Sequence, residues 1–481
     1  MEAVTEVVSK ASDYLWNVIL IILLCGTGIY FTIRLKFIQI RKFGEGFKLV
    51  FGNISLKGEK GKNGEMTTFQ SLATAIAAQV GTGNLAGAAT ALIGGGPGAI
   101  FWMWVSAFFG MSTIYAEATL AQQYKVQKDG EVTGGPVYYI RAAFKGAFGK
   151  ALAAIFAILI VLALGFTGNM VQSNSIGAAF SEVFSARNIE IPSIVFGLIL
   201  AAVIGFIFLG GVNRLASVVE KIVPIMAGIY IVGSLVLILM NITALPEAIK
   251  MIFVGAFNPE AVVGAGAGIA VREAIRFGVA RGLFSNEAGM GSAPNAAATA
   301  AVSHPVKQGL IQALSVFTDT LIICSCTAFI ILLSDVPLDG TVKGIQLTQM
   351  ALSHQIGSVG GQFIAICILL FAFSSIVGNY SYCETNLFFI SKNKTYLQLY
   401  RIIVGGMVMF GSIAALDLVW NIADLFMAIM AITNLIAIVL LGKIALKALQ
   451  DYNRQRRISK KNIIFKSSSI SELKDSTSEW E

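Results

Sequence analysis

Stretches of about 20 apolar residues recur along the whole chain, and they limit its fold more than any other feature. The first is LWNVILIILLCGTGIYFTI (15–33), which shows no alternation of apolar and polar positions. Such a segment must satisfy its own backbone hydrogen bonds in lipid, so it forms a helix and not a barrel strand. Hydrophobic residues make up 56% of the 481 residues and charged residues only 13%. The sequence therefore predicts an all-α polytopic membrane protein.

Hydropathy predicts about eleven transmembrane helices. They are 15–33, 68–94, 98–122, 151–178, 192–210, 222–240, 263–283, 308–333, 360–390, 400–416 and 424–442. The first is taken as a span and not as a signal peptide, because it is too long and lacks a cleavage site of small residues.

The basic residues predict the orientation, because short cytoplasmic loops are enriched in lysine and arginine. With the N-terminus outside, most of the 35 lysines and arginines fall in inner loops and in the C-terminal tail. The outer loops keep only Lys10, Arg187, Lys250 and Lys343. The N-terminus is therefore expected outside and the C-terminus inside. The net charge of +8 then indicates orientation and contact with anionic lipid, and not nucleic-acid binding.

The second span contains AAQVGTGNLAG (77–87), which places glycines and small polar residues where a helix should run. Its G-x-G-x-x-A pattern is not a dinucleotide site, because no strand precedes it and no acidic residue follows at the required distance. Close packing against a neighbouring helix is one explanation. A broken helix is the other, because unwinding frees carbonyls for a cation and N–H groups for a carboxylate. The interleaved polar side chains favour the broken helix.

A second interruption is expected in AVREAIRFGVARGLFSNEAGMG (270–291), between Gly278 and Gly282. Leaving out the first helix, the other ten then divide into two groups of five that each open with an interrupted helix, as in inverted repeats. The predicted units are an N-terminal helix and basic loop (1–65), a first repeat (66–240), a second repeat (241–447) and a cytoplasmic tail (448–481). We expect the tail to be a short amphipathic extension followed by disorder.

The stretch GGPGAIFWMWVSAFFG (95–110) is similar to the signature of the alanine or glycine:cation symporter family. Further similar stretches are TTFQSLATAIAAQVGTGN (67–84), GGPVYYI (134–140), GNMVQSNSI (168–176), ARGLFSNEAGMGSAPNAAATA (280–300) and LFAFSSIVGNYSYCE (370–384). This resemblance implies sodium- or proton-coupled uptake of a small neutral amino acid. It also implies the inverted-repeat fold of the bacterial leucine transporter with one extra N-terminal helix.

The resemblance implies a binding site at the first break. The amides of Thr82 and Gly83 would hold the substrate carboxylate. Sodium would be held by the carbonyls of Ala77, Val80 and Phe371 and the hydroxyls of Ser374 and Ser375. Oxygens without full negative charge suit a monovalent cation better than calcium or magnesium. The alternative is that the two serines only bond back to their own helix.

The predicted substrate contacts come from four spans. They are Gln79, Thr82, Gly83, Asn84, Gln172, Asn174, Ile275, Gly278, Ser375 and Asn379. Asn379 departs from the family, where a tryptophan walls off the pocket. An amide in place of an indole leaves room and adds a donor and an acceptor. Glutamine is therefore the first substrate candidate, with alanine still open.

Four further ionisable residues in or near the spans are candidates for function. Asp319 lies in the middle of the eighth span and is a second cation site, a proton carrier or a structural acceptor. Glu117, Arg281 and Glu287 form an inner gate of ion pairs or a static set of loop contacts.

Other classes of function fit less well. A channel needs a continuous polar lining, whereas the polar residues gather at the two breaks. An enzyme needs a base and a nucleophile in one place, and the sequence has no motif that supplies them. We expect no cofactor apart from sodium as co-substrate, no nucleic-acid partner, a monomer in the lipid bilayer, and a plasma-membrane location.

Overall fold

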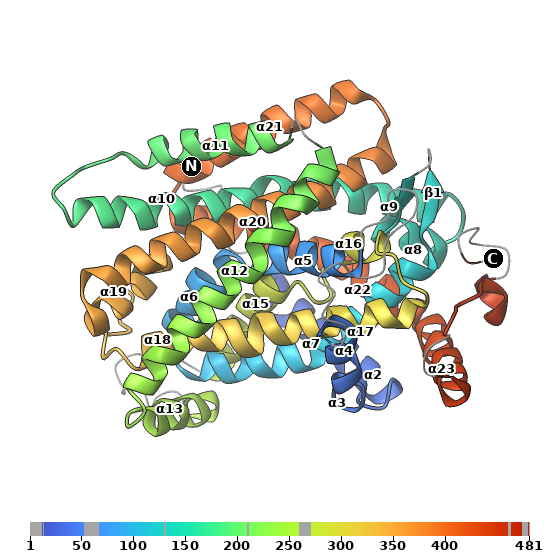
Figure 1. The fold of residues 1–481 in the computed structure, drawn as a ribbon, viewed down its shortest axis with the longest axis horizontal. Helices are drawn as coiled ribbons and strands as arrows, with labels where there is room; N and C mark the ends of the chain where they lie inside the picture. Colours follow the sequence, from blue (N-terminus) through green and yellow to red (C-terminus); the bar gives the residue numbers. More distant parts are fainter. Residues whose placement is uncertain are drawn as a thin grey trace.

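The computed structural model describes residues 12, 14–51, 67–128, 131–208, 211–258, 271–459, 463–473 and 480, and these are almost entirely helical (Figure 1). The first part contains α2 (Ile21–Arg34), α3 (Ile38–Arg41), α4 (Phe43–Phe51), α5 (Thr68–Gln79), α6 (Ala88–Gly95), α7 (Gly98–Gln123), α8 (Pro136–Ala143), α9 (Gly146–Ile160), α10 (Asn169–Ser185), α11 (Ser193–Phe208), α12 (Gly211–Met240) and α13 (Leu245–Phe257). The second part contains α15 (Val271–Asn286), α16 (Pro294–Ala298), α17 (Pro305–Val316), α18 (Ser325–Leu332), α19 (Ile345–Ile356), α20 (Ser358–Ile390), α21 (Lys394–Ile413), α22 (Leu416–Leu440) and α23 (Gly442–Ile458).

Shorter elements join these helices. Four π-helical stretches are η1 (Leu15–Leu20), η2 (Gly83–Gly87), η3 (Val161–Gly168) and η4 (Phe317–Cys324), and two 3-10 turns are η5 (Ser467–Ser469) and η6 (Ser471–Leu473). Strands β1 (Val126–Lys128) and β2 (Glu131–Thr133) form an antiparallel ribbon that pairs Val126 with Thr133. The start of the predicted span 263–283, the end of 192–210 and residues 52–66 of the basic loop lie outside the described residues.

The described helices include seven that are long and apolar enough to cross a membrane, or eight when a bent pair is taken as one span. Two shorter apolar helices, α2 and α11, coincide with the first and fifth predicted spans. The prediction of a helical polytopic membrane protein is therefore confirmed.

The second predicted span is broken where the sequence indicated. Helix α5 begins with a capping box, in which the Thr67 side chain accepts from the Gln70 amide and the Gln70 side chain from the Thr67 amide. It ends at Gln79, and Val80 is extended with φ −78° and ψ 94°. The two halves of the span are bent by 44°. The peptide groups around this bend are thus released from the helical ladder.

The second predicted break is misplaced. Helix α15 runs without interruption through Gly278 and Gly282 to Asn286. Both glycines face α7: a Cβ at Gly278 would lie 2.7 Å from Trp102 Cβ, and one at Gly282 would lie 2.7 Å from Ser106 Oγ. These glycines, four residues apart, let two membrane helices approach closely.

The chain turns sharply after α15. Glu287, Gly289 and Gly291 have φ of 58°, 95° and 81°, the left-handed region that favours glycine. A short helix, α16, follows at Pro294. The interruption therefore begins just beyond Asn286 and not between Gly278 and Gly282.

The helices form two groups around the broken span. Helix α7 packs along α15 and α17, while α10 packs against α20 and α21, and α20 also contacts α5. Figure 1 shows α10, α11 and α21 on one side, α7 and α17 on the other, and α5 and α20 between them. The break at Val80 is consequently buried in the centre of the molecule.

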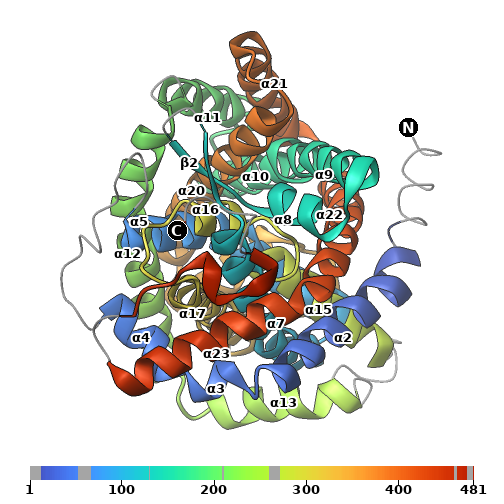
Figure 2. The same cartoon turned by 90° about the vertical axis from the view of Figure 1, so that its right-hand side faces the viewer.

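The C-terminal tail is more ordered than we predicted. Helix α23 is the expected amphipathic extension, but residues beyond it are packed in the described part (Figure 2). The Phe465 amide donates to the Ser303 carbonyl at 2.9 Å, and Trp480 Nε1 donates to the Gln122 carbonyl at 2.7 Å. Phe465 and Trp480 are 2% and 7% exposed. Burying such aromatic rings stabilises an otherwise polar segment.

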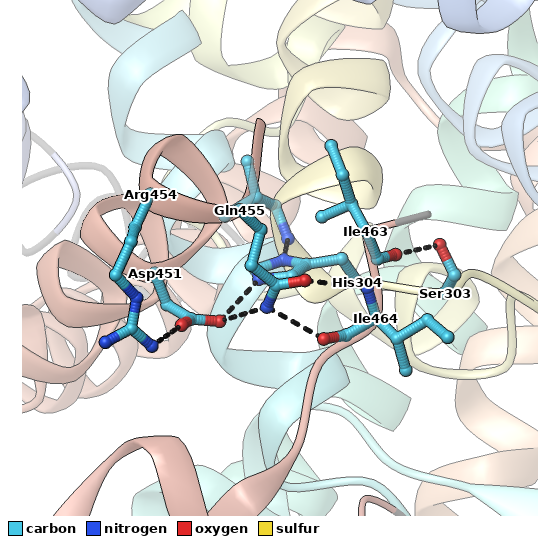
Figure 3. A network of polar contacts seen from close by, with 8 residues as sticks. Ser303, His304, Asp451, Arg454, Gln455, Ile463 and Ile464 are labelled. Atoms are coloured by element: carbon cyan, nitrogen blue, oxygen red, sulfur yellow. Dashed lines mark hydrogen bonds and ion pairs between the residues drawn. The ribbon is translucent and has the colours of Figure 1, made fainter. Parts of the chain in front are cut away.

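His304 connects this tail to the start of α17 (Figure 3). Its Nδ1 accepts from the Val306 amide at 3.2 Å, and its Nε2 lies 3.4 Å from Asp451 Oδ2. Burial lowers the pKa of His304, and the bond to Asp451 opposes that shift. The neutral ring therefore carries its proton on Nε2 and donates a hydrogen bond to Asp451. The Asp451 carboxylate also accepts hydrogen bonds from Arg454 and Gln455.

Candidate functional site

The broken segment places backbone groups at the centre of the site. The Gly81 amide donates to Asn84 Oδ1 at 2.8 Å, which closes the start of the second half-helix. The Thr82 amide and hydroxyl both donate to Gln172 Oε1, at 3.0 and 2.6 Å. These four residues, Gly81, Thr82, Asn84 and Gln172, are all buried. The Thr82 donors converge on one acceptor, which is the arrangement that a carboxylate oxygen requires.

The five oxygens predicted to hold sodium lie in one cluster. Ser375 Oγ is 3.0 Å from the Ala77 carbonyl, 3.4 Å from that of Val80 and 3.1 Å from that of Phe371. Ser374 Oγ is 3.4 Å from the Ala77 carbonyl and 2.8 Å from that of Phe371. Back-bonding to their own helix therefore accounts for only part of the serines' contacts, because both also reach α5. The set offers neutral oxygens from two helices, which suits a weakly held monovalent ion.

The wall of α15 that faces the break is two turns from the one we predicted. A Cβ at Gly83 would lie 2.8 Å from Ser285 Cα and 3.0 Å from Phe284 Cδ1. Gly278, predicted as a substrate contact, faces α7 instead, and Ile275 precedes it on the same helix. Phe284 and Ser285 are therefore the residues of α15 that sequence reasoning missed. Their sequence signal was their place at the end of the helix, directly before the turn.

Asp319 joins the first break to α15. Its carboxylate accepts from Asn84 Nδ2 at 2.7 Å, Ser285 Oγ at 2.8 Å and Thr320 Oγ1 at 2.8 Å. These donors are all neutral, and Asp319 is 0% exposed. A buried carboxylate with neutral donors alone is costly unless a cation or a proton neutralises it.

The remaining predicted substrate contacts differ in their surroundings. Both amide atoms of Gln79 are buried and have no hydrogen-bond partner within the described part of the chain. Asn379 Nδ2 donates to Asn169 Oδ1 at 3.1 Å. Asn174, in contrast, donates to the Gly411 and Ala414 carbonyls, so it ties α10 to α21 and is used structurally.

The predicted inner gate does not form as an ion-pair set. Arg281 pairs with Asp424 on α22, through Nη1 to Oδ1 at 3.1 Å and a second bond from Nη2, and it stacks 4.5 Å over the Trp420 ring. Glu117 instead accepts from the Gly289 amide at 2.9 Å, with further bonds from the Gly291 amide and Asn434.

Glu287 accepts from Ser292 Oγ at 2.6 Å. Glu117 thus holds the turn after α15, and Arg281 pairs with a carboxylate, Asp424, that the sequence did not single out. Two backbone contacts to one carboxylate fix the geometry of that turn.

The cluster of neutral oxygens can bind a small cation, and the Thr82 donors can bind a carboxylate. Binding of this kind alters neither ligand chemically. Within residues 1–467 the sequence matches the model of the Sodium:alanine symporter family. The chain belongs to the Sodium:alanine symporter family. It is accordingly a sodium-coupled amino-acid symporter of the membrane and not an enzyme, and amino acid and sodium are its transported substrates.

Relatives in this family cover nearly the whole chain. The probable sodium/glutamine symporter GlnT of Bacillus subtilis is 47% identical over 97% of this chain and 94% of its own length. The amino-acid carrier protein AlsT of Bacillus subtilis is 48% identical over 99% of this chain and 97% of its own length. The sodium/alanine symporter AgcS of Methanococcus maripaludis is 39% identical over 95% of this chain and 99% of its own length.

A solved structure shares the fold. The crystal structure of MhsT in complex with L-phenylalanine has a TM-score of 0.54 and 14% identity, covering 85% of this chain and 92% of that one. At this identity the likeness shows the fold alone, which is the leucine-transporter-like fold that the sequence resemblance implied.

Proposed function

We propose that this symporter imports a small neutral amino acid whose carboxylate binds at Thr82 and Gly83. A sodium ion would bind beside it, among the oxygens of Ala77, Val80, Phe371, Ser374 and Ser375. The convergence of these five oxygens from α5 and α20 is the observation that carries the proposal. Since these oxygens come from two helices far apart in the sequence, α5 and α20, an ion between them would couple its binding to their relative movement.

Gln172 supports the position of the carboxylate. Its Oε1 accepts both Thr82 donors, and a substrate carboxylate would accept the same bonds more strongly because it is charged. Substrate binding would then displace the Gln172 carboxamide from Thr82. Bound sodium nearby would favour that exchange, so the affinity for each ligand should rise with the other.

The membrane arrangement is part of the proposal. We infer eleven spans with two inverted groups of five, an outer N-terminus and an inner C-terminus, in the plasma membrane and as a monomer. The excess of lysine and arginine in the loops assigned to the inside supports the orientation. Rearrangement of α7, α15 and α17 against α10, α20 and α21 would expose the site alternately to each side.

Uptake into proteoliposomes tests the function and the substrate. A sodium gradient is imposed, labelled alanine is supplied, and unlabelled amino acids compete. Glutamine is the first candidate, because Asn379 offers an amide and because GlnT is named a sodium/glutamine symporter, whereas AgcS is named for alanine. Uptake that does not respond to the sodium gradient would contradict the ion site. Competition by alanine and glycine without glutamine would contradict the wider pocket.

Asn379→Trp should narrow the range of substrates. The Asn379 amide nitrogen lies 3.4 Å from the place of a Cβ at Gly168, the last residue of η3, so a larger indole would crowd this side of α20. We expect glutamine competition to weaken by about tenfold or more, the cost of about 1.4 kcal/mol of lost binding, with alanine affected less. Asn379→Ala is the control, because it removes the amide without filling the space. Equal loss of alanine and glutamine in the tryptophan variant would count against a size filter.

We propose Asp319 as a second cation-binding group, for sodium or a proton. Asp319→Asn keeps the size of the side chain but removes its charge. We expect the dependence of uptake on sodium concentration to become less steep if it binds sodium, or the dependence on pH to flatten if it carries a proton. The exposed loop residue Asp335 gives the control variant Asp335→Asn. Unchanged sodium and pH dependence in Asp319→Asn would leave only a structural role.

A further inference from the structure

A basic cavity lies between the N-terminal helices and α23. It has a volume of about 370 Å³, and among the described residues that line it half are arginine or lysine and none is acidic. The basic residues are Arg34, Lys36, Arg41, Arg454 and Arg457. Leu35, Leu446 and Leu449 form its apolar part. A cavity with this lining attracts an anion, because like charges gathered around a concave surface reinforce one another.

The turn that builds one wall is strained. Lys36 and Phe37 have φ of 54° and 55°, and neither is a glycine, so both pay a backbone cost to be left-handed. The Lys36 carbonyl accepts from Arg41 Nη1 at 3.2 Å, which holds the Arg41 side chain beside the turn. Strained backbone of this kind persists where the surrounding structure fixes it, and here it brings three cationic residues to one wall.

The other wall is held by contacts to α4. Tyr452 OH donates to Glu45 Oε1 at 2.6 Å, and Arg456 Nη1 lies 2.7 Å from Glu45 Oε2. Figure 2 shows α23 running beside α2, α3 and α4. Glu45 is thereby engaged with α23, and its charge is compensated outside the cavity. Arg454 pairs with Asp451, so the positive charge of the cavity lining comes mainly from Arg34, Lys36, Arg41 and Arg457.

Exposed apolar residues lie next to Arg34, Lys36 and Arg41 in the sequence. Ile33, Phe37 and Ile40 are 60%, 47% and 61% exposed. They lie at the end of the first span, which faces the inner leaflet in the orientation proposed above. Exposed apolar residues beside a basic cavity match the acyl chains and the phosphate of a phospholipid, whereas a soluble anion would need only the charges.

We propose that this cavity binds the phosphate headgroup of an anionic phospholipid of the inner leaflet. The inference rests on the proposed orientation, because the same cavity on the outer side would meet a different leaflet. The lipid would bridge α2 and α3 to α23. Arg454, which pairs with Asp451 in the network around His304 (Figure 3), would connect the site to the start of α17.

Lipid retention tests the proposal on the full-length protein. The protein is reconstituted with phosphatidylglycerol or phosphatidylcholine, purified in detergent, and its bound lipid is measured by native mass spectrometry. We expect the Arg34→Gln, Lys36→Gln, Arg457→Gln variant to lose retained phosphatidylglycerol by about tenfold or more relative to the unmodified protein. The matched control removes the same charge from exposed residues of other inner loops: Lys145→Gln, Lys150→Gln, Lys394→Gln. It should retain phosphatidylglycerol.

The outcomes separate the alternatives. If the control variant loses as much phosphatidylglycerol as the cavity variant, the proposal is wrong. It is also wrong if the unmodified protein retains phosphatidylcholine as well as it retains phosphatidylglycerol. Stabilisation by inorganic phosphate or glycerol 3-phosphate without lipid would assign the cavity to a soluble phosphate and also overturn it. Arg457→Gln alone serves if the triple variant does not fold, and it should lose a smaller share of the lipid. Sodium-driven uptake is measured separately, so failure of the transport proposal would not affect the lipid result.

Discussion

We expect Gly81→Ala to raise strongly the sodium concentration that uptake requires. An added Cβ would overlap Ser375 Oγ and would lie 3.1 Å from Ser375 Cβ and 3.0 Å from Gln172 Oε1. It would thus enter the proposed ion site and push away the group that holds Thr82. Overpacking of this kind costs about 1–3 kcal/mol, which corresponds to a loss of up to about 100-fold in apparent sodium affinity. The measurement is initial uptake into proteoliposomes over a range of sodium concentrations.

Gly87→Ala is the matched control. It changes the same residue type in the same broken span, but its added Cβ would meet nothing closer than Trp420 Cη2 at 3.7 Å. Alanine is also a better helix former than glycine, by about 1 kcal/mol. We therefore expect uptake close to that of the unmodified protein. Normal sodium dependence in Gly81→Ala would show that the ion does not bind where Ser375 approaches this glycine.

The first break could be predicted because local sequence and function agree there. Gly81 and Gly83 weaken the helix, and Thr82 and Asn84 supply polar groups that stabilise the unwound backbone. The family resemblance then pointed to carbonyls and hydroxyls far apart in the sequence. The structure places Ala77 next to Ser375, a proximity that no local pattern contains.

The second break was misplaced because glycine has two uses in a membrane helix. Gly278 and Gly282 are four residues apart, and this spacing produces a smooth face for α7. Gly289 and Gly291 are two residues apart, and both adopt positive φ. Spacing therefore distinguishes the two uses here. Glycines four residues apart lie on the same face of a helix and allow close packing, whereas glycines two residues apart do not share a face.

Long-range polar partners could not be read from the sequence. Arg281 pairs with Asp424, which is 143 residues away and stands at the start of a predicted span. Nothing local distinguishes that carboxylate from Glu117 or Glu287. The tail was misjudged for a related reason: its polar composition predicts disorder, but Phe465 and Trp480 are spaced apolar residues whose burial needs a partner surface elsewhere.

Ser374→Ala with Ser375→Ala should raise the sodium concentration needed for half-maximal uptake. The double variant removes both hydroxyl ligands and leaves the three carbonyls of Ala77, Val80 and Phe371. If each hydroxyl contributes about 1.4 kcal/mol, each removal weakens sodium binding by about tenfold. Because the proposed ion also favours the substrate, apparent affinity for the amino acid should fall as well, most strongly at low sodium. Uptake is measured as a grid of sodium and substrate concentrations.

Ser381→Ala is the control on the same helix, since Ser381 is also buried and has no part in the proposed oxygen cluster. The two single variants decide how the ion is held. Ser375 contacts the carbonyls of both Ala77 and Val80, whereas Ser374 reaches only that of Ala77, and at a longer distance. Ser375→Ala should therefore have the larger effect. Sodium dependence unchanged in the double variant would mean that these hydroxyls only join α20 to α5, and that the coupled ion binds elsewhere, with Asp319 the next group to examine.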